Sequence, residues 1–403
     1  MSIHRIVIAG ALALTLSPLA FSQEDYYSRS FNSPEPVQQY TQVHLVSNLS
    51  GVAAVTYPNL ANAWGLSRSS GCDWWTSDYT TGLSTLYSGT TGAIAPVVVT
   101  IPPSDPTVNS TGSPTGMIFN GTTDFTIGAG KAAVFLFATE DGTISGWNPS
   151  VEPTKAVIVV NEAQKSVFKG LTIAQASLHG GPLEDYLYAA NIRNGQVSLY
   201  NSKFQHNQEA EENFAHFRSP DGYAPFNVQN IGGNIYITFA KQDAAKHDEV
   251  DGAGLGFVVV FRPDGCPIQM LQRGNWFNAP WGLAAAPSDF GAYSHDILVG
   301  NFGSGEILAF DLVTGALHSK LRDAKTMQSR FKACGVFPSA TARRLADQQR
   351  RSSSALYQPG SEWPVRNFDG DSEHRWQRRL ALAGSRAQFT WRPACYMRCG
   401  AFW

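Results

Sequence analysis

The sequence predicts an all-β protein, a six-bladed β-propeller, on three observations. Short apolar segments open on a Gly or an Asn at nearly even spacing, with steps of 51, 54, 57 and 55 residues between Gly65, Gly116, Gly170, Asn227 and Gly282. Each segment is followed by a hairpin pattern, and helical periodicity is scarce before about residue 320. A repeat of this length fits one four-stranded propeller blade and is too long for a helical or leucine-rich solenoid.

The elements follow in the same order in every repeat. The first strand is expected in NAWGLS, PTGMIFN, FKGLTIA, APFNVQNI and APWGLAAA. The second and third strands are expected in WWTSDYTTGLSTLYS, FLFATEDGTISGWNP, LYAANIRNGQVSLYN, ITFAKQD with GFVVVFRPDG, and ILVGNFGSGEILAFD. Val, Ile, Phe, Tyr and Leu flank Asp, Asn and Gly in these segments, which is typical of strands joined by tight turns.

The N-terminus predicts secretion, to the periplasm or outside the cell. Residues 1–22 have a basic start at His4 and Arg5, an apolar core, and a small-x-small cleavage pattern at Ala20-Phe21-Ser22. A membrane anchor is the alternative, but Pro18 interrupts an apolar run that is shorter than the ~20 residues of a spanning helix. Residues 23–40 are then a flexible leader and residues 41–324 the propeller, with no membrane span left after signal cleavage.

The last segment, residues 325–403, has a different composition. From Asp323 to Trp403 there are 14 Lys and Arg and 6 Asp and Glu, against 16 and 26 in the rest of the chain. A basic tail that binds nucleic acid is one interpretation. We favour out-of-frame translation, because a one-base shift permits, within codon degeneracy, the first strand GLWGLSFGNG of a sixth repeat near residue 335. The tail is then aberrant and disordered or poorly folded, and we expect no nucleic-acid partner.

Charge and cysteine content add little to this interpretation. Charged residues make up 15% of the chain and aromatic residues 12%, as suits a secreted β-rich protein. Cys72 and Cys266 lie in the first and fourth repeats, on opposite sides of a six-bladed ring, and are not expected to pair.

Several strings of the chain are distinctive as well as periodic. They include LVSNLSGVAAVTYPNLANAWGLS, FATEDGTISGWNP, NAPWGLAAAP and the long run GYAPFNVQNIGGNIYITFAKQDAAKHDEVDGAGLGFVVVF, and they cover about residues 42–324. In these strings the chain resembles a family of bacterial secreted propellers of unknown function that often carry a C-terminal sorting signal. The resemblance implies a six-bladed ring similar to NHL-repeat and gluconolactonase-like propellers. It implies no substrate.

The repeat register predicts a set of polar residues around one end of the central channel. The set comprises Asn62, Asn227 and Asn278 at first-strand starts, and Asp78, Glu140, Asn191, Lys241 and Asn301 at second-strand ends. Carboxylate and amide oxygens that converge from several blades would suit Ca²⁺. The alternative is structural, because Asp, Asn and Glu beside Gly are common turn formers.

The fourth repeat carries an insertion, KQDAAKHDEVDGAGLG, between its second and third strands. It supplies five potential ligands or proton carriers, Asp243, His247, Asp248, Glu249 and Asp251. Loops on a rigid scaffold often carry function. The spacing is not that of an EF-hand, and a solvated lid without a ligand is the alternative.

These features favour a non-enzymatic propeller that binds a small molecule, or an extracellular or envelope protein, on its channel face. The alternative is a Ca²⁺-dependent hydrolase or lactonase, with Glu140 or Asp78 as ligand and base. GxSxG, HExxH, P-loop and CxxC motifs are absent from the sequence, and no residue is assigned to catalysis. Trp64, Trp281 and Phe226 are expected to pack between blades. The oligomeric state is open.

Overall fold

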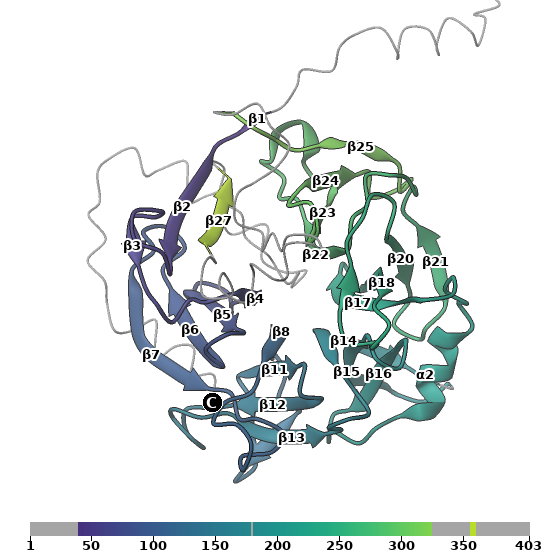
Figure 1. Cartoon of the computed structure of the whole chain (residues 1–403). Helices are drawn as coiled ribbons and strands as arrows, with labels where there is room; N and C mark the ends of the chain where they lie inside the picture. The colour runs from purple at the N-terminus through teal and green to yellow at the C-terminus, as the bar shows by residue number, and fades with distance from the viewer. Residues whose placement is uncertain (1–38, 179, 325–354, 360–403) are drawn as a thin grey trace, which may run out of the picture. The chain divides into compact units, whose positions relative to one another are not determined.

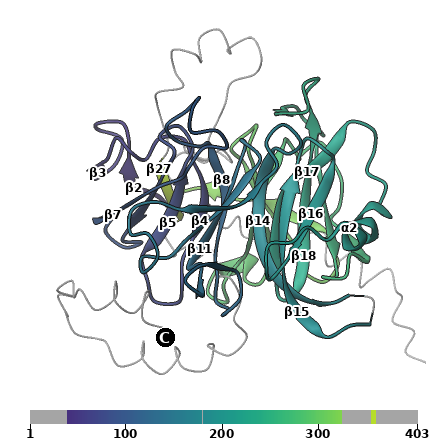
Figure 2. The same cartoon turned by 90° about the horizontal axis from the view of Figure 1, so that it is seen from below.

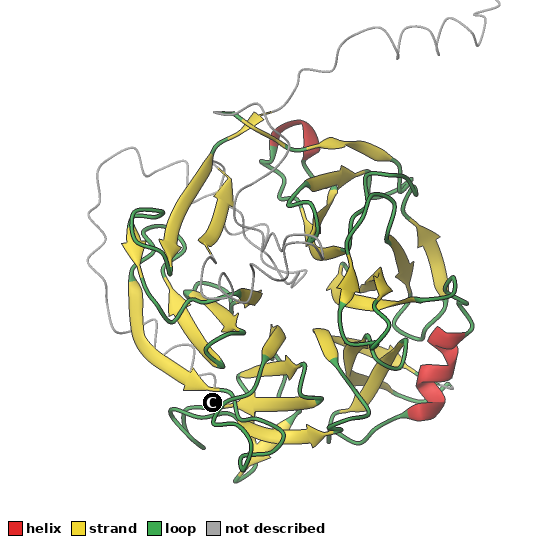
Figure 3. Cartoon of the chain, viewed as in Figure 1, coloured by secondary structure: helices red, strands yellow, loops and turns green. Residues whose placement is uncertain are grey.

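Five antiparallel sheets follow one another along the chain (Figure 1). The computed structural model describes residues 39–178, 180–324 and 355–359, in which regular structure is almost entirely β-strand (Figure 3). Each sheet contains one of the five repeat segments, so an all-β propeller with five blades is confirmed. The predicted sixth first strand, near residue 335, lies outside the described residues, as do the signal and the leader up to residue 38.

Within each blade the strands are ordered from the inner strand outward. Blade 1 contains β4 (Ala63–Ser67), β5 (Trp74–Asp78), β6 (Leu83–Tyr87) and β7 (Ile94–Thr100). Blade 2 contains β8 (Pro114–Phe119), β11 (Phe135–Thr139), β12 (Thr143–Trp147) and β13 (Val157–Asn161). Blade 3 contains β14 (Phe168–Ser177), β15 (Leu183–Asn191) and β16 (Gln196–Asn201). Blade 4 contains β17 (Tyr223–Ile231), β18 (Asn234–Gln242), β20 (Phe257–Phe261) and β21 (Pro267–Met270), with β19 (Glu249–Val250) paired to β18. Blade 5 contains β22 (Pro280–Ala285), β23 (Ile297–Asn301), β24 (Ile307–Phe310) and β25 (Leu317–Lys320).

The first strands β4, β8, β14, β17 and β22 lie nearest the centre, and each contacts the next (Figure 1). Turned by 90°, β14, β17 and β18 are seen along their length, next to one another (Figure 2). An apolar core fills the space between each pair of neighbouring blades. Burial of these faces is the main stabilising contribution to the sheets.

Three of the four repeated glycines, Gly65, Gly116 and Gly170, are explained by how closely the first strands approach, whereas a Cβ at Gly282 would make only ordinary contacts, at 3.5 Å from Gly300. A Cβ added at Gly65 would lie 2.6 Å from the carbonyl oxygen of Thr115 in the next blade. A Cβ at Gly116 would lie 2.7 Å from the Cα of Gly170, and one at Gly170 would overlap Asn227 Oδ1. Because a side chain does not fit at these distances, the period of the sequence marks the points where backbones meet around the axis.

Blade 3 departs from the expected four strands. The helix α2 (Gln208–Ala215) follows β16 where a fourth strand was predicted, and Asn207 caps it by accepting a hydrogen bond from the Ala210 N–H. Glu211 Oε1 accepts the backbone N–H of Leu199 in β16 at 2.8 Å, so the helix satisfies part of the strand edge that a neighbouring strand would otherwise cover.

The remaining elements are short. β1 (Gln39–Tyr40) pairs in parallel with β26 (Arg322–Asp323), β9 (Thr126–Gly128) pairs with β10 (Lys131–Ala132), and η1 (Gly291–Tyr293) is a single turn. β2 (Gln42–Ser47) pairs with β3 (Val55–Thr56) and with β27 (Ala355–Pro359), so one strand of the tail segment is described although that segment was expected to be disordered or poorly folded.

Two further predictions from the sequence can be compared with the structure. Cys266 is a free thiol and Cys72 is disulfide-bonded, so the two do not pair, as expected. Among the described residues, no helix is long and apolar enough to cross a membrane.

Candidate functional site

The residue before each repeat Gly or Asn occupies an equivalent place on the five inner strands. These residues are Trp64, Thr115, Lys169, Phe226 and Trp281. The Trp64 ring lies 5.5 Å from Trp281, 6.1 Å from Phe226 and 5.0 Å from Phe302 of blade 5. We call these four side chains the central aromatic cluster. A residue of blade 1 thus touches blades 4 and 5, which confirms the expected inter-blade packing and shows that the described blades surround a shared axis.

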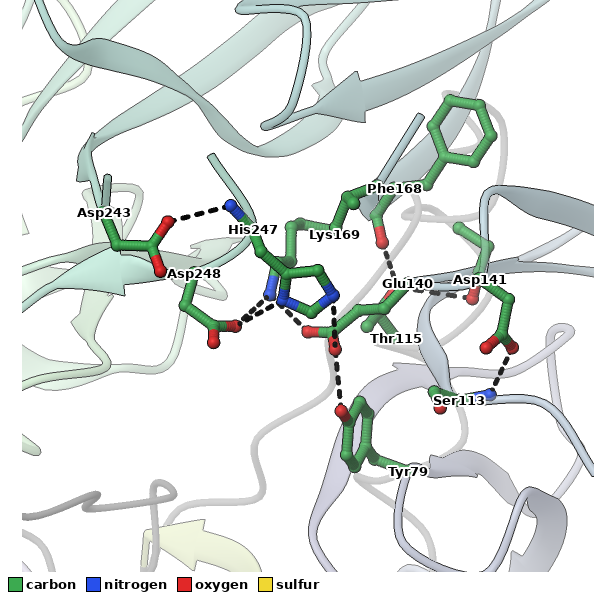
Figure 4. Close-up of polar contacts among 12 residues, drawn as sticks. Tyr79, Ser113, Thr115, Glu140, Asp141, Phe168, Lys169, Asp243, His247 and Asp248 are labelled. Carbon is green, nitrogen blue, oxygen red and sulfur yellow. Dashed lines mark hydrogen bonds and ion pairs between the residues drawn. The ribbon is translucent and has the colours of Figure 1, made fainter. Parts of the chain in front are cut away.

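Lys169 is the charged exception among these residues. Its side chain is fully buried, and its Nζ donates a hydrogen bond to Glu140 Oε1 of blade 2 and another to Asp248 Oδ1 at 3.2 Å (Figure 4). The ammonium also lies 5.2 Å from the centre of the Trp64 ring, a cation–π contact. Two carboxylates from different blades therefore compensate one buried charge, as a buried lysine requires.

The insertion of blade 4 places His247 and Asp248 against this pair. The backbone N–H of His247 donates to Asp243 Oδ1 at 2.9 Å, which fixes the turn (Figure 4). His247 Nδ1 lies 3.2 Å from Asp248 Oδ1, and its Nε2 lies 4.0 Å from Glu140 Oε2. From blade 1, the Tyr79 hydroxyl donates to Glu140 Oε2 at 2.7 Å. We call Tyr79, Glu140, Lys169, His247 and Asp248 the charged cluster.

The charged cluster contains shifted pKa values with identifiable causes. Burial opposes the charge of Lys169, but Glu140, Glu249 and Asp248 outweigh it and raise the pKa of the ammonium. Burial also opposes ionisation of Asp248, yet the hydrogen bond from His247 and the charge of Lys169 hold the pKa of Asp248 well below its usual range. The hydrogen bond to Asp248 raises the pKa of His247. Burial raises the pKa of Glu249 to about 7.

Of the predicted second-strand residues, only Glu140 joins this cluster through side-chain contacts. Asp78 is fully buried in blade 1 and accepts hydrogen bonds from Thr76 Oγ1 at 2.9 Å and Thr85 Oγ1 at 2.5 Å. Asn191 Oδ1 accepts the backbone N–H of Val167, and Asn301 Oδ1 accepts that of Asn278. These three side chains bond within their own blades, as the turn-forming alternative predicts.

The other predicted residues also make local contacts or bridge neighbouring blades. Asn227 Nδ2 donates to the carbonyl of Trp281 at 2.6 Å and so ties blade 4 to blade 5. Asn278 Oδ1 accepts the Gly252 N–H, the Asn62 carbonyl accepts the Tyr79 N–H, and the Lys241 ammonium lies over the Tyr223 ring. Asp251 lies beside Gly303 of blade 5, where an added Cβ would meet its Oδ1 at 2.5 Å.

Sequence reasoning missed Lys169 and Tyr79. The signal for Lys169 was present, because its equivalents in three of the other four repeats are the aromatic residues Trp64, Phe226 and Trp281. A single Lys at an otherwise aromatic or uncharged position indicates a specific partner. Tyr79 carries no such signal, since an aromatic residue after a strand is common.

The residues do not fit the predicted Ca²⁺ site. Ca²⁺ takes six to eight oxygen ligands. Asp78, Asn191 and Asn301 are engaged in their own blades, and the donors that do gather are Glu140, His247 and Asp248, one of which is an imidazole. No step of a Ca²⁺-dependent hydrolysis follows from this geometry.

No model of a known protein family matches the chain. The chain is similar to three uncharacterised proteins of Acanthamoeba polyphaga mimivirus. One is 32% identical over 198 residues, which is 48% of this chain and 35% of that protein. A second is 30% identical over 66% of each chain, and a third is 28% identical over 66% of this chain and 70% of the relative. The chain thus spans about a third of the first relative and about two thirds of the second.

The chain is also similar to solved structures, at low sequence identity. A streptogramin B lyase has a TM-score of 0.45 at 10% identity, over 73% of this chain and 77% of the other. A putative 6-phosphogluconolactonase from Bacteroides uniformis has a TM-score of 0.36 at 14% identity, over 63% of this chain and 69% of the other. The assignment of this chain as a propeller rests on its own sheets and inner-strand contacts.

Proposed function

We propose that the chain is a secreted, non-enzymatic propeller that binds a small molecule, or an extracellular or envelope protein, at the charged cluster. The observation that carries this proposal is the meeting of side chains from four blades at one place. Tyr79, Glu140, Lys169 and the His247-Asp248 pair come from blades 1, 2, 3 and 4 in turn. Elsewhere, residues at comparable strand ends are used inside their own blades.

The charged cluster combines two buried side chains with two partly exposed ones. Lys169 and Glu140 have side chains that are 0% and 5% exposed, whereas His247 and Asp248 are 37% and 41% exposed. Preorganised polar groups that still reach solvent are what a binding surface needs. At a pH above the pKa of Glu249, which is about 7, and with His247 neutral, Glu140, Asp248 and Glu249 outnumber the single ammonium of Lys169, so the surface favours a ligand or partner with a positively charged group.

The test uses charged peptides as probes. A Lys-rich peptide should bind the purified chain, and affinity should fall with added salt because Asp248 is partly exposed. Asp248→Ala should weaken binding by roughly tenfold, since a charge pair of this kind contributes about 1.4 kcal/mol or more. Asp264→Ala is the matched control, because Asp264 is a similarly exposed carboxylate that pairs with Arg262 in blade 4. Equal affinity in wild type and Asp248→Ala, or preference for an acidic peptide, would refute the proposal.

We further propose the domain boundaries and the location in the cell. Residues 1–22 act as a secretory signal, residues 23–40 as a leader, and residues 325–403 as an out-of-frame tail in place of a sixth blade. The charge reversal at residue 323 and the end of the repeat support this. Intact mass of the exported product tests the signal, because the product should begin after residue 22. Resequencing tests the tail, because it should find a frame change near the codons for residues 325–330. An uninterrupted frame, or a retained N-terminus, would refute the respective point.

A further inference from the structure

We propose that Glu140, His247 and Asp248 form a binding site for a divalent transition-metal cation, for which Zn²⁺ is the appropriate probe. The inference deepens the proposed function and rests on it for a biological role, because a bound ion would lie on the surface to which we assign partner binding. The site itself is argued from its donor atoms and charges.

The donor atoms converge from two separate segments of the chain. Glu140 follows β11 in blade 2, whereas His247 and Asp248 belong to the insertion of blade 4. One ligand atom from each of the three lies within 4.8 Å of the others, and in the described part of the chain this is the only group of three or more such residues. Two atoms that bind one ion at about 2.1 Å are at most about 4.2 Å apart, so closure needs a shift below about one ångström.

The donor set selects the class of ion. One imidazole with two carboxylates is a mixed nitrogen and oxygen set, which suits Zn²⁺ and its neighbours in the first transition row. Ca²⁺ and Mg²⁺ prefer oxygen ligands only, and Mg²⁺ also demands octahedral geometry. A site with three protein ligands, two of them partly exposed, leaves a further coordination position to water or to a partner's side chain.

The net charge of the carboxylates and Lys169 allows a divalent cation to bind although a lysine is present. Glu140, Asp248 and the neighbouring Glu249 supply three carboxylates, and Lys169 supplies one ammonium. When all of these groups are ionised and His247 is neutral, two negative charges remain, the number that one divalent ion neutralises. Lys169 bonds Glu140 Oε1 and Asp248 Oδ1, so the ammonium does not use the second oxygen of either carboxylate; Glu140 Oε2 accepts one hydrogen bond, from the Tyr79 hydroxyl.

Lys169 also defines the competing interpretation. An internal ammonium can stabilise these carboxylates alone, in which case the cluster is a structural ion-pair network without a metal. The two interpretations differ in whether an added ion binds one-to-one and whether the imidazole is needed. His247 is the decisive residue, because it is partly exposed and makes no ion pair with Lys169.

The experiment measures Zn²⁺ bound to the full chain by equilibrium dialysis with elemental analysis, and the dissociation constant by calorimetry. We expect one Zn²⁺ per chain, bound at least about tenfold more weakly by His247→Ala, since one of three ligands is lost. His318→Ala is the matched control. His318 is 43% exposed and lies 2.8 Å from Asp296 and 3.8 Å from Asp311, but these residues do not form a group of the kind described above. The His318→Ala variant should bind Zn²⁺ with the same affinity as the wild type.

Two outcomes would overturn the inference. One is a stoichiometry near zero, and the other is equal affinity in His247→Ala and wild type. Glu140→Gln provides a second ligand test, but it alters the buried pair with Lys169, so the half-exposed His247 variant keeps the inference falsifiable if Glu140→Gln does not fold. Running the peptide-binding test with a chelator separates the two proposals: peptide binding without Zn²⁺ binding would refute only the metal site.

Discussion

Asp78 is the last residue of β5 and Glu140 is the first residue after β11, so the two lie one position apart in neighbouring repeats, and their carboxylates do opposite things. Asp78 turns into blade 1, where two threonine hydroxyls donate hydrogen bonds to it. Glu140 lies one residue further along its repeat, and from there its side chain reaches the buried ammonium of Lys169 in blade 3. A difference of one position in the repeat therefore separates a carboxylate that bonds within its own blade from one that bridges to the next blade.

The largest expected effect comes from removing the partner of the buried ammonium. Glu140→Ala should lower the free energy of unfolding by about 4 kcal/mol, because a buried charge loses its closest counter-charge. Urea denaturation measures this. The double variant Glu140→Ala with Lys169→Met should recover much of the loss, since no charge is then left buried. A loss below about 1 kcal/mol in the single variant would show that Asp248 alone can compensate Lys169.

The second prediction concerns Asp78, the carboxylate that accepts hydrogen bonds from two threonine hydroxyls. Burial raises the pKa of Asp78 to about 7 from a usual value of 3.8, so the folded state binds the proton more tightly than the unfolded chain does. Stability should fall as pH rises, by about 3 kcal/mol between pH 5 and pH 8 from this residue. Glu249 and His247 add changes of the same sign.

Asp78→Asn should therefore flatten the pH dependence. Chemical denaturation at several pH values between 5 and 8 measures it, and the variant should lose about half of the total slope because Glu249 remains. If wild type and Asp78→Asn show the same slope, then Asp78 does not titrate in this range, and the contrast with Glu140 is one of geometry alone.

Smaller effects come from the hydroxyl groups that bond each carboxylate. Thr85→Val removes the donor to Asp78 Oδ2 in a fully buried place, and should cost about 2 kcal/mol at pH 8, where Asp78 is charged. The cost should shrink at pH 5, where the protonated carboxyl needs the donor less. An equal cost at both pH values would point to lost packing instead of a lost hydrogen bond to a charge.

The smallest effect is expected at the charged cluster's own hydroxyl. Tyr79→Phe removes the donor to Glu140 Oε2, and should cost about 1 kcal/mol because Tyr79 is partly exposed and Lys169 still holds the carboxylate. Denaturation at pH 7 measures it beside Thr85→Val. A cost above that of Thr85→Val would mean that Tyr79, and not Lys169, mainly positions Glu140.

The fold was predictable from sequence because the glycine period has a direct steric cause. Gly65, Gly116 and Gly170 recur where inner strands meet too closely for a Cβ, so the pattern that identified the repeats is the contact that builds the propeller. The helix α2 in blade 3 was not predicted. A helix of only eight residues carries too little helical periodicity to be recognised in the sequence. Its place beside blade 3 depends on Glu211, which accepts a hydrogen bond from the edge of β16.

The candidate site was only partly predictable. His247, Asp248 and Glu140 were nominated from an insertion and from repeat position, and they do meet. Asp78, Asn191 and Asn301 were nominated by the same argument but bond within their own blades. Each is the last residue of its second strand, whereas Glu140 is the first residue after its strand, and successive strand residues point to opposite sides. A period in the sequence records backbone placement, but it contains no information on which neighbour satisfies a polar group.

The close approach of the inner strands also limits where the length of this chain can change. An extra residue in β4, β8 or β14 would move a side chain into the place now held by Gly65, Gly116 or Gly170. Between β18 and β20, by contrast, blade 4 accommodates a whole insertion without disturbing the pairing of these two strands. Such a protein can therefore be lengthened in the loops that join its strands, including loops that reach the inner strands, but not within the inner strands themselves.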